Sequence, residues 1–209
     1  MYLCDIGNTN VDFFLDGKMW SISIDEFKEF TTDEKVYYIN VNSKVIEFLE
    51  EKKNFIDLEP YFNFDTIYQG MGSDRIAACY TIKDGMIVDA GSAISVDIMS
   101  NGIHLGGFLL PGLSKYKETY ASISPVLDKN INLNVSLEAL PQSTRDAVSY
   151  GILKPILMLL KDQCKYKHIY FTGGDGQFFS RFFKQSIYDK ALVFRGMRAA
   201  LQETGFKDE

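Results

Sequence analysis

A strand-like segment followed by a glycine turn occurs twice in this chain, and this internal repeat constrains the fold more than any other feature. The first copy begins Asp5-Ile-Gly-Asn-Thr and runs to Gly17, and the second begins Asp89-Ala-Gly-Ser-Ala and runs to Gly102. Each copy has an apolar run ending in Asp, a glycine, hydroxyl or amide residues, an alternating strand and a second turn. Two such units predict a duplicated fold of two related lobes facing one cleft, although Asp-x-Gly is also common in ordinary turns.

Short strand-like runs alternate with helix-like patterns along the 209 residues, which predicts an α/β fold. The expected strands are Tyr2–Ile6, Val11–Leu15, Met19–Ile24, Val36–Val41, Met86–Asp89, Ala93–Met99, His168–Thr172 and Ala191–Phe194. The expected helices are Ser43–Lys53, Ser73–Lys83, Lys115–Ile123, Ser143–Lys161, Gln177–Gln185 and Met197–Glu203. Ser43 is the expected cap of the first helix.

The composition excludes several classes of function. A net charge of −6 without a run of Lys and Arg argues against binding to nucleic-acid phosphates. No apolar stretch approaches the roughly 20 residues that cross a bilayer, and the start lacks the pattern of a signal peptide. Three distant cysteines suit a reducing cytoplasm. His104 and His168 have no second ligand at metal spacing, so we expect structural or surface roles for both.

The first glycine turn has the chemistry of a phosphate loop. Gly7 has no Cβ and allows close approach of the backbone to phosphate, while Asn8 and Thr9 add side-chain donors. Asp5 would repel phosphate directly, so a carboxylate there makes sense through a hydrated Mg²⁺. An ordinary β-turn with side-chain hydrogen bonds is the alternative. The chain lacks the Gly-x-x-x-x-Gly-Lys-Ser/Thr pattern of P-loop enzymes.

The second copy supplies an equivalent pair of groups. Ser92 can donate to phosphate and Asp89 can hold a cation, or Asp89 can be a buried turn carboxylate. A third turn, Phe171-Thr-Gly-Gly-Asp-Gly, suits the flat face of a nucleoside but is also an ordinary strand-to-helix connection. The nearby Phe178-Phe179 and Phe182-Phe183 pairs are expected in the core or an interface rather than on a nucleobase.

Between the two copies, Gly70-Met-Gly-Ser-Asp-Arg opens a helix with an apolar face. Asp74 in its first turn could accept the proton of an acceptor hydroxyl, and Arg75 could bind a carboxylate or phosphate in a forked geometry. The alternative is that Asp74 only satisfies N–H groups at the helix start.

Five motifs occur in an order that resembles type III pantothenate kinases over nearly the whole chain. They are Asp5-x-Gly-Asn-Thr, Gly72-x-Asp74-Arg75, Asp89-Ala-Gly-Ser-Ala, Gly106-Gly-x-x-x-Pro111-Gly and Thr172-Gly-Gly. The resemblance implies the acetate and sugar kinase, Hsp70 and actin fold, with two ribonuclease H-like lobes around a central cleft. These lobes would be residues 1–88 and 89–209, and the last helix could pack back on the first lobe.

The resemblance also implies an activity: ATP-dependent phosphorylation of the pantothenate hydroxyl to 4′-phosphopantothenate, the first step of coenzyme A biosynthesis. Asp74 would be the general base. The ATP contacts would be Asp5, Ile6, Gly7, Asn8, Thr9, Asn10, Val11, Asp12, Ser92, Gly173 and Gly174. The metals would be Mg²⁺ held through water by Asp5, and a monovalent cation, K⁺ or NH₄⁺, at Asp89.

The pantothenate site implied by the resemblance comprises Tyr68, Gly72, Ser73, Asp74, Arg75 and Thr144. In the family, which works as a homodimer, the residue matching Thr144 reaches pantothenate across the subunit interface. This chain departs from the family pattern in the shortened Tyr68-Gln-Gly-Met segment, in Ser92 where Thr is usual, and in Ser143 where Asn precedes Thr144.

Two other functions fit the residues. The first is a different small-molecule kinase, or a phosphatase that cleaves polyphosphate, on the same fold. The second is a non-catalytic regulator of the Bvg accessory factor type, against which the acidic composition and the three aspartates Asp5, Asp74 and Asp89 argue.

Overall fold

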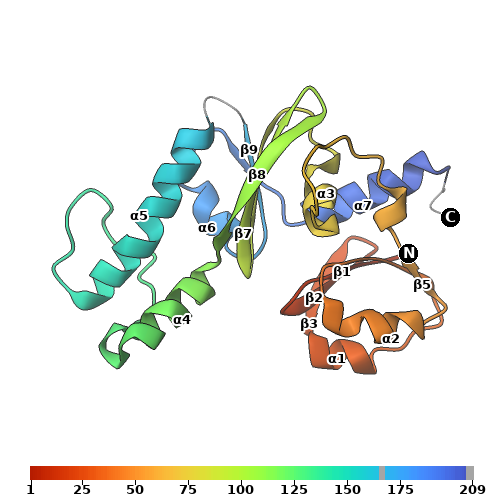
Figure 1. Cartoon of the computed structure of the whole chain (residues 1–209), viewed down its shortest axis with the longest axis horizontal. Helices are drawn as coiled ribbons and strands as arrows, with labels where there is room; N and C mark the ends of the chain where they lie inside the picture. Colours follow the sequence, from red (N-terminus) through yellow and green to blue (C-terminus); the bar gives the residue numbers. More distant parts are fainter. Residues whose placement is uncertain (165–167, 206–209) are drawn as a thin grey trace.

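The computed structural model describes residues 1–164 and 168–205, which form two five-stranded sheets with helices between and outside them (Figure 1). The first sheet has the order β3-β2-β1-β4-β5 and the second has the order β10-β9-β6-β7-β8. The strands of the first are β1 (Tyr2–Ile6), β2 (Asn10–Leu15), β3 (Lys18–Ser23), β4 (Val36–Asn40) and β5 (Phe55–Asp57). Those of the second are β6 (Gly85–Ala90), β7 (Ala93–Ser100), β8 (Ile103–Pro111), β9 (Ile169–Thr172) and β10 (Ser186–Tyr188).

The two sheets repeat one topology. In each, the first strand pairs antiparallel with the second and parallel with the fourth, and the fourth pairs parallel with the fifth. The second and third strands form an antiparallel hairpin in both sheets. The internal repeat in the sequence is therefore a structural duplication, as predicted.

Helices follow the strands in the same pattern in both halves. They are α1 (Ile24–Glu29), α2 (Ile46–Glu50), α3 (Ser73–Tyr80), α4 (Leu113–Ile123), α5 (Thr144–Cys164), α6 (Gly176–Ser180) and α7 (Leu192–Glu203). Short 3₁₀ turns lie at Ser43–Val45, Glu59–Tyr61 and Pro125–Leu127. Thus α3 follows the last strand of the first sheet, just as α7 follows the last strand of the second.

The helices α3 and α7 pack together between the two sheets (Figure 1). Their core joins Leu3 and Ile39 of the first sheet to Ile87 of the second. Gly196 of α7 permits the close approach, because a Cβ there would meet the backbone carbonyl of Ala77 in α3. Fully burying one side chain of this size contributes about 1.5–3 kcal/mol, so this shared core ties the halves together.

The outer faces of the sheets are covered by other helices. On the first sheet, Cys4 and Phe13 pack against Phe27 of α1. On the second, Met86 and Val88 pack in a cluster with residues of α5, whereas Ile87 between them faces α3 and α7. The pleat of the strand explains this division, because successive side chains point to opposite faces.

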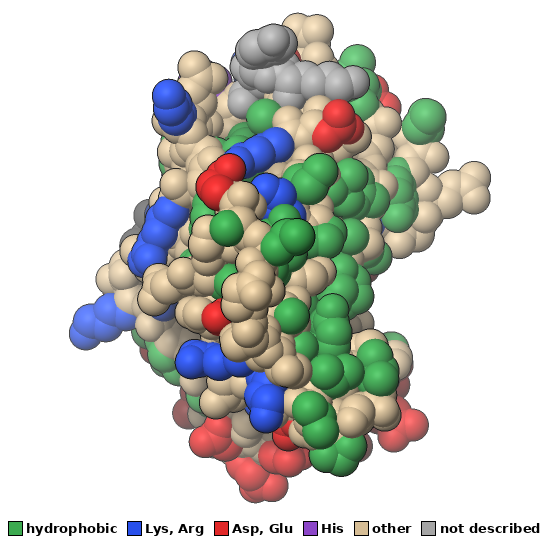
Figure 2. All heavy atoms as spheres, turned by 90° about the vertical axis from the view of Figure 1, so that its left-hand side faces the viewer, with side chains coloured by type: hydrophobic (Ala, Val, Ile, Leu, Met, Phe, Trp, Pro, Cys, Tyr) green, Lys and Arg blue, Asp and Glu red, His purple; other side chains and the backbone are tan. Residues whose placement is uncertain are grey.

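The segment from α4 to α5 forms one end of the molecule and exposes large apolar side chains. Figure 2 looks onto this end and shows apolar groups running down one side of the face, with Lys and Arg side chains toward the other. The exposed apolar residues of this segment are Ile123, Val126, Leu133, Leu140 and Met158. No helix within the described residues is long and apolar enough to cross a membrane.

Two local predictions are wrong, and the helix expected over Gln177–Gln185 ends early, at Ser180. The segment Ala191–Phe194 is not a strand: α7 begins at Leu192, and its β-branched and aromatic side chains are buried against α3. Tertiary packing here overrides the weak preference of those residues for strands. Ser43 is not a cap, because it lies inside a 3₁₀ turn whose N-cap is Asn42, which accepts from the backbone N–H of Lys44.

Candidate functional site

Asp5 lies within electrostatic reach of three other carboxylates, which come from three other elements. Asp5 and Asp12 are directly paired across β1 and β2. Asp89 lies near the end of β6 and Asp74 in the first turn of α3. The charges of Asp12, Asp74 and Asp89 all act on Asp5, which places these three within electrostatic reach of it.

This convergence changes how the carboxyl groups ionise. Burial, followed by the charges of Asp74, Asp89 and Asp12, raises the pKa of Asp5 well above its usual value. Burial and the same kind of repulsion raise the pKa of Asp89 to about 7. Burial also raises the pKa of Asp74, although hydrogen bonding to the Arg75 N–H and the Arg75 charge oppose it. The cluster is therefore short of positive charge.

The described residues offer no closed cage of metal ligands. Within residues 1–164 and 168–205, no group of three or more His, Cys, Asp or Glu side chains is arranged to hold a metal ion. Hard cations such as Mg²⁺ readily keep several waters and take only one or two carboxylates from a protein. The raised pKa values of Asp5 and Asp89 indicate a place where a positive charge would be stabilised.

The glycine turns of the two halves touch each other. Thr9 Oγ1 lies 2.9 Å from Ser92 Oγ, although the two residues are 83 positions apart. Each turn closes on itself: the Gly7 N–H donates to the Asn10 carbonyl and the Gly91 N–H to the Ala93 carbonyl. The hydroxyl groups predicted to bind phosphate therefore meet at one point.

The side chains of the first turn divide into two sets. Asn8, Thr9 and Asn10 are exposed, so their side chains can reach a ligand. Ile6 and Val11 are fully buried among apolar residues of the first sheet, so only their backbone atoms could do so. Asn42, which the sequence analysis did not single out, donates from Nδ2 to the Gly7 carbonyl at 3.2 Å and supports the turn.

The third glycine turn lies against the second. Gly173 has φ of +78°, and a Cβ there would meet both Asp89 Oδ1 and the Ala90 carbonyl. The Asp175 N–H donates to that carbonyl at 2.9 Å. Gly174 is exposed, with no atom within 4 Å of the position that a Cβ would take, so bare backbone is presented beside Asp89.

The aromatic residues after this turn lie in the core, as expected. Phe179 is fully buried, and Phe178, Phe182 and Phe183 pack against the same cluster as residues of α5. Each helps to anchor α6 to the second sheet.

The start of α3 holds Asp74 close to the backbone. The Arg75 N–H donates to Asp74 Oδ1 at 2.7 Å, and a Cβ on Gly72 would lie 2.5 Å from the same oxygen. A side chain at position 72 would therefore push the Asp74 carboxylate out of this position. Ser73 is buried, and its hydroxyl lies 3.5 Å from the Asn40 carbonyl of β4, which fixes α3 against the first sheet.

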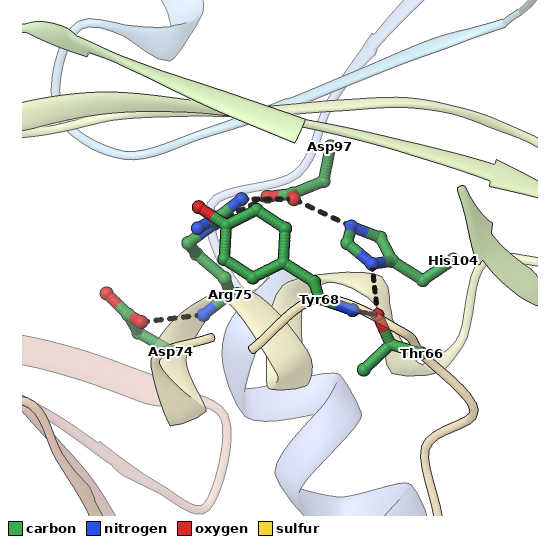
Figure 3. Close-up of polar contacts among 6 residues, drawn as sticks. All are labelled: Thr66, Tyr68, Asp74, Arg75, Asp97 and His104. Atoms are coloured by element: carbon green, nitrogen blue, oxygen red, sulfur yellow. Dashed lines mark hydrogen bonds and ion pairs between the residues drawn. The ribbon is translucent and has the colours of Figure 1, made fainter. Parts of the chain in front are cut away.

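The fork of Arg75 is already occupied. Its Nε and Nη2 donate to the two carboxylate oxygens of Asp97, at 3.0 and 2.6 Å, and both side chains are almost fully buried (Figure 3). The ring of Tyr68 lies over the guanidinium, and its centroid is 4.6 Å from Arg75 Cζ. A ligand can thus reach only the remaining edge of Arg75, not the forked edge considered from the sequence.

The Asp97 carboxylate belongs to a wider network that sequence reasoning missed. His104 links Asp97 to Thr66 through its two ring nitrogens (Figure 3). Asp97 lies within the second sequence copy, but nothing in the pattern showed which basic residue it would meet. His104 was expected to be structural or on the surface, and it is buried; His168 is exposed.

Thr144 is not brought to the carboxylates. It is exposed in the first turn of α5, which covers the outer face of the second sheet, whereas α3 lies on the inner face (Figure 1). Ser143 and Asp146 form reciprocal hydrogen bonds at this helix start.

Comparisons with known proteins agree with the order of the motifs. Residues 47–165 match the family model of type III pantothenate kinase. The type III pantothenate kinase of Campylobacter jejuni is 58% identical over 97% of each chain. These similarities do not favour the alternative of a non-catalytic regulator.

Two solved structures show the same fold. A Campylobacter jejuni protein, provisionally named a Baf family transcriptional activator, superposes with a TM-score of 0.92 at 57% identity over 98% of this chain and 99% of that one. A Sinorhizobium meliloti protein, provisionally named a 2-dehydro-3-deoxygalactonokinase, superposes with a TM-score of 0.63 at 9% identity over 100% and 98% of the two chains. The second likeness concerns the fold alone, which is the two-lobed fold of actin-like ATPases and sugar kinases.

Proposed function

The chain belongs to the type III pantothenate kinase family and is a pantothenate kinase, and from this premise we propose how its residues divide the reaction. The enzyme transfers the γ-phosphoryl group of ATP to the hydroxyl of pantothenate, giving 4′-phosphopantothenate for coenzyme A biosynthesis. The observation that carries the assignment of roles is the convergence of Asp5, Asp74 and Asp89, which come from the two sheets and the helix between them.

Asp74 is the general base in this proposal. It would accept the proton of the pantothenate hydroxyl as that oxygen attacks the γ-phosphorus. Its pKa, raised by burial, moves toward the working pH, which favours proton transfer, while the Arg75 N–H and charge help to keep the carboxylate ionised. The Arg75 N–H also fixes the orientation of the carboxylate.

The two touching turns form the ATP site. Asp5 to Asp12 would surround the phosphates with backbone N–H groups and with the exposed donors of Asn8, Thr9 and Asn10, and Ser92 would add a hydroxyl from the second turn. Gly173 and Gly174 would receive the nucleoside, since they present bare backbone beside Asp89.

Two cations complete this site. Asp5 would hold Mg²⁺ through water, and Asp89 would hold a monovalent cation, K⁺ or NH₄⁺. Both carboxylates have raised pKa values because they are buried near other negative charges, so each is a favourable neighbour for a cation. When bound, the cations offset the negative charge of the phosphates.

Pantothenate would bind along the start of α3. Gly72, Ser73 and Arg75 would line this site with Tyr68, whose ring lies over the guanidinium of Arg75. Since Ser73 is buried, its contribution would be through the backbone. The remaining edge of Arg75 could then meet the carboxylate of the substrate.

A homodimer would bring Thr144 of a second copy to this site. Thr144 is exposed and lies away from Asp74 within one chain. The exposed apolar residues between α4 and α5 offer a surface for a second copy, since such side chains are often covered by a partner. Light scattering tests this: a mass near 24 kDa rather than twice that value would exclude the dimer.

The three unpaired cysteines suit a reducing cytoplasm.

The substitution Asp74→Asn tests the assignment of the base. We expect kcat to fall by about 100-fold or more, because general-base catalysis typically contributes 10²–10⁴-fold. ATP affinity should stay within about threefold, since Asp74 is not among the proposed nucleotide contacts. A coupled assay of ADP release with pantothenate, in the presence and absence of K⁺, measures kcat. Calorimetry with ATP measures the ATP affinity.

Asp84→Asn is the matched control, because Asp84 is an exposed carboxylate at the turn before β6 that accepts only the Asn101 N–H among its described contacts. It should retain full turnover. Near-normal kcat in Asp74→Asn, with pantothenate still phosphorylated, would remove Asp74 from the mechanism.

A further inference from the structure

We propose that His104 is a positioning residue for the pantothenate site, acting through Asp97 on Arg75 and through Thr66 on Tyr68. This inference rests on the proposed contact of Tyr68 and Arg75 with pantothenate. It goes further by assigning a role to His104, Asp97 and Thr66, which contact Arg75 and Tyr68 but not the substrate. His104 itself is buried and would not touch the substrate.

The hydrogen bonds around His104 form one continuous chain (Figure 3). His104 Nε2 lies 2.9 Å from Asp97 Oδ1, and Nδ1 lies 2.7 Å from Thr66 Oγ1. The Tyr68 N–H donates to the same threonine oxygen at 3.0 Å. One residue on β8 is therefore connected to both sides of the Tyr68–Arg75 pair.

The chemistry of the partner groups indicates which atom donates in each of these hydrogen bonds. An ionised Asp97 can only accept, so Nε2–H of His104 donates to it. Since Thr66 Oγ1 accepts from the Tyr68 N–H, its own hydroxyl hydrogen is free to donate to Nδ1. In the neutral imidazole, each donor and acceptor is then used once, and this pattern of partners selects one ring orientation and one tautomer.

The network holds the guanidinium of Arg75 in one place. Asp97 receives Arg75 in a bidentate pair and His104 in a third hydrogen bond on Oδ1. Gly107, paired with Asp97 across β7 and β8, leaves room for this arrangement: a Cβ there would meet Asp97 Oδ1 and lie 2.8 Å from Arg75 Nη2. The Arg75 edge available to a ligand is thereby fixed relative to the sheet.

The same network holds the segment that carries Tyr68. Thr66 and His104 form an isolated parallel bridge, and the His104 N–H donates to the Asp65 carbonyl at 3.3 Å. The rings of Phe64 and Tyr68 both lie against the imidazole, with centroids 5.7 and 6.0 Å away. Because residues 62–72 contain no helix or long strand, these contacts decide where the Tyr68 ring stands over Arg75.

Three substitutions of His104 separate the two arms of the network. His104→Asn can place an amide near the Nδ1 position and keep the hydrogen bond to Thr66. His104→Gln can place an amide near the Nε2 position and keep the hydrogen bond to Asp97. His104→Phe loses both hydrogen bonds but retains a ring against Phe64. We expect the KM for pantothenate to rise by about tenfold or more in the Phe variant and by less in the other two, because the Phe variant loses both hydrogen bonds and each of the others loses one. The KM for ATP should change by less than about twofold.

Asn54→Ala is the matched control. Asn54 also loses two hydrogen bonds, to the Thr32 and Glu34 carbonyls, but it lies just before β5 at the edge of the first sheet, outside this network. If His104 has a purely structural role, His104→Phe and Asn54→Ala should both lower the urea midpoint. Both should then leave the KM for pantothenate and the KM for ATP unchanged. That result in a folded His104→Phe, or in the Asn and Gln variants if Phe does not fold, would overturn the proposal.

Tyr68→Ala distinguishes this proposal from its premise. If Tyr68→Ala raises the KM for pantothenate and the His104 variants do not, the contact stands and the positioning role is wrong. If Tyr68→Ala leaves that KM unchanged, the substrate contact itself is wrong and the positioning role is lost with it. A rise in both, with wild-type KM for ATP, supports the role of His104.

Discussion

The two halves of the molecule repeat one strand order but use their carboxylates differently. In the first sheet, Asp5 and Asp12 are paired across β1 and β2 with no basic partner among the described ion pairs. In the second sheet, Asp89 stands opposite Ser95, and the carboxylate on β7 is Asp97, two residues further along. Asp97 is buried and fully engaged by Arg75 and His104.

This difference shows that one duplicated topology surrounds its carboxylates with different partners. The first sheet presents Asp5 and Asp12 with no ion-pair partner among the described residues, which suits the cations proposed to accompany ATP. The second half keeps one such carboxylate, Asp89, and uses another to hold Arg75 on the helix between the sheets. The second half also carries the longer insertion between its third and fourth strands, where α4 and α5 replace the six-residue α1.

The largest effect expected from this contrast concerns stability. Asp97→Asn should lower the free energy of unfolding by about 3 kcal/mol, because it leaves the buried guanidinium of Arg75 without its ionic partner. Asp12→Asn should leave it unchanged or raise it, because it removes a charge that repels Asp5. Urea denaturation of both variants measures this, and equal losses in the two would contradict the distinction between the halves.

The next effect is a dependence of stability on pH from Asp89. Its pKa is about 7 in the folded chain against 3.8 as the ordinary value, so the protonated carboxyl stabilises the fold and this stabilisation is lost as the pH rises through about 7. Without nucleotide, Mg²⁺ or K⁺, wild type should lose about 2 kcal/mol relative to Asp89→Asn between pH 5 and pH 8. If the free energies of unfolding of the two proteins differ by the same amount at pH 5 and at pH 8, the pKa of Asp89 is not raised in the folded chain.

The smallest effect concerns the contact between the two turns. Thr9→Val removes the hydrogen bond to Ser92, which is exposed, so stability should fall by less than about 1 kcal/mol. The KM for ATP should rise by a few-fold, because the variant loses both the contact between the two turns and the hydroxyl proposed to donate to phosphate. Thr32→Val is the control, since Thr32 also loses one exposed hydrogen bond, to the Glu34 N–H. The same KM for ATP in both variants would mean that this contact does not matter for nucleotide binding.

Much of the fold could be predicted from the sequence because its signals are local. Alternating apolar residues and glycine turns marked the strands β1, β2, β6 and β7, and their recurrence indicated two related units. Local signals failed where burial decided the outcome: Leu192, Val193 and Phe194 read as a strand but are helical because their side chains pack between the sheets. The edge strands β5 and β10 were missed because three residues carry too little pattern, and β8, which follows the second hairpin turn, was not singled out either.

The sequence by itself determined the kind of chemistry: three aspartates beside glycine turns and an order of motifs shared with type III pantothenate kinases. Only the tertiary structure decided which groups act together. The register of β7 and β8 and the position of α3 bring Arg75, Asp97, His104 and Thr66 into one network, although they lie up to 38 positions apart. Such pairings depend on distances through space, which residue types and spacing along the chain do not specify.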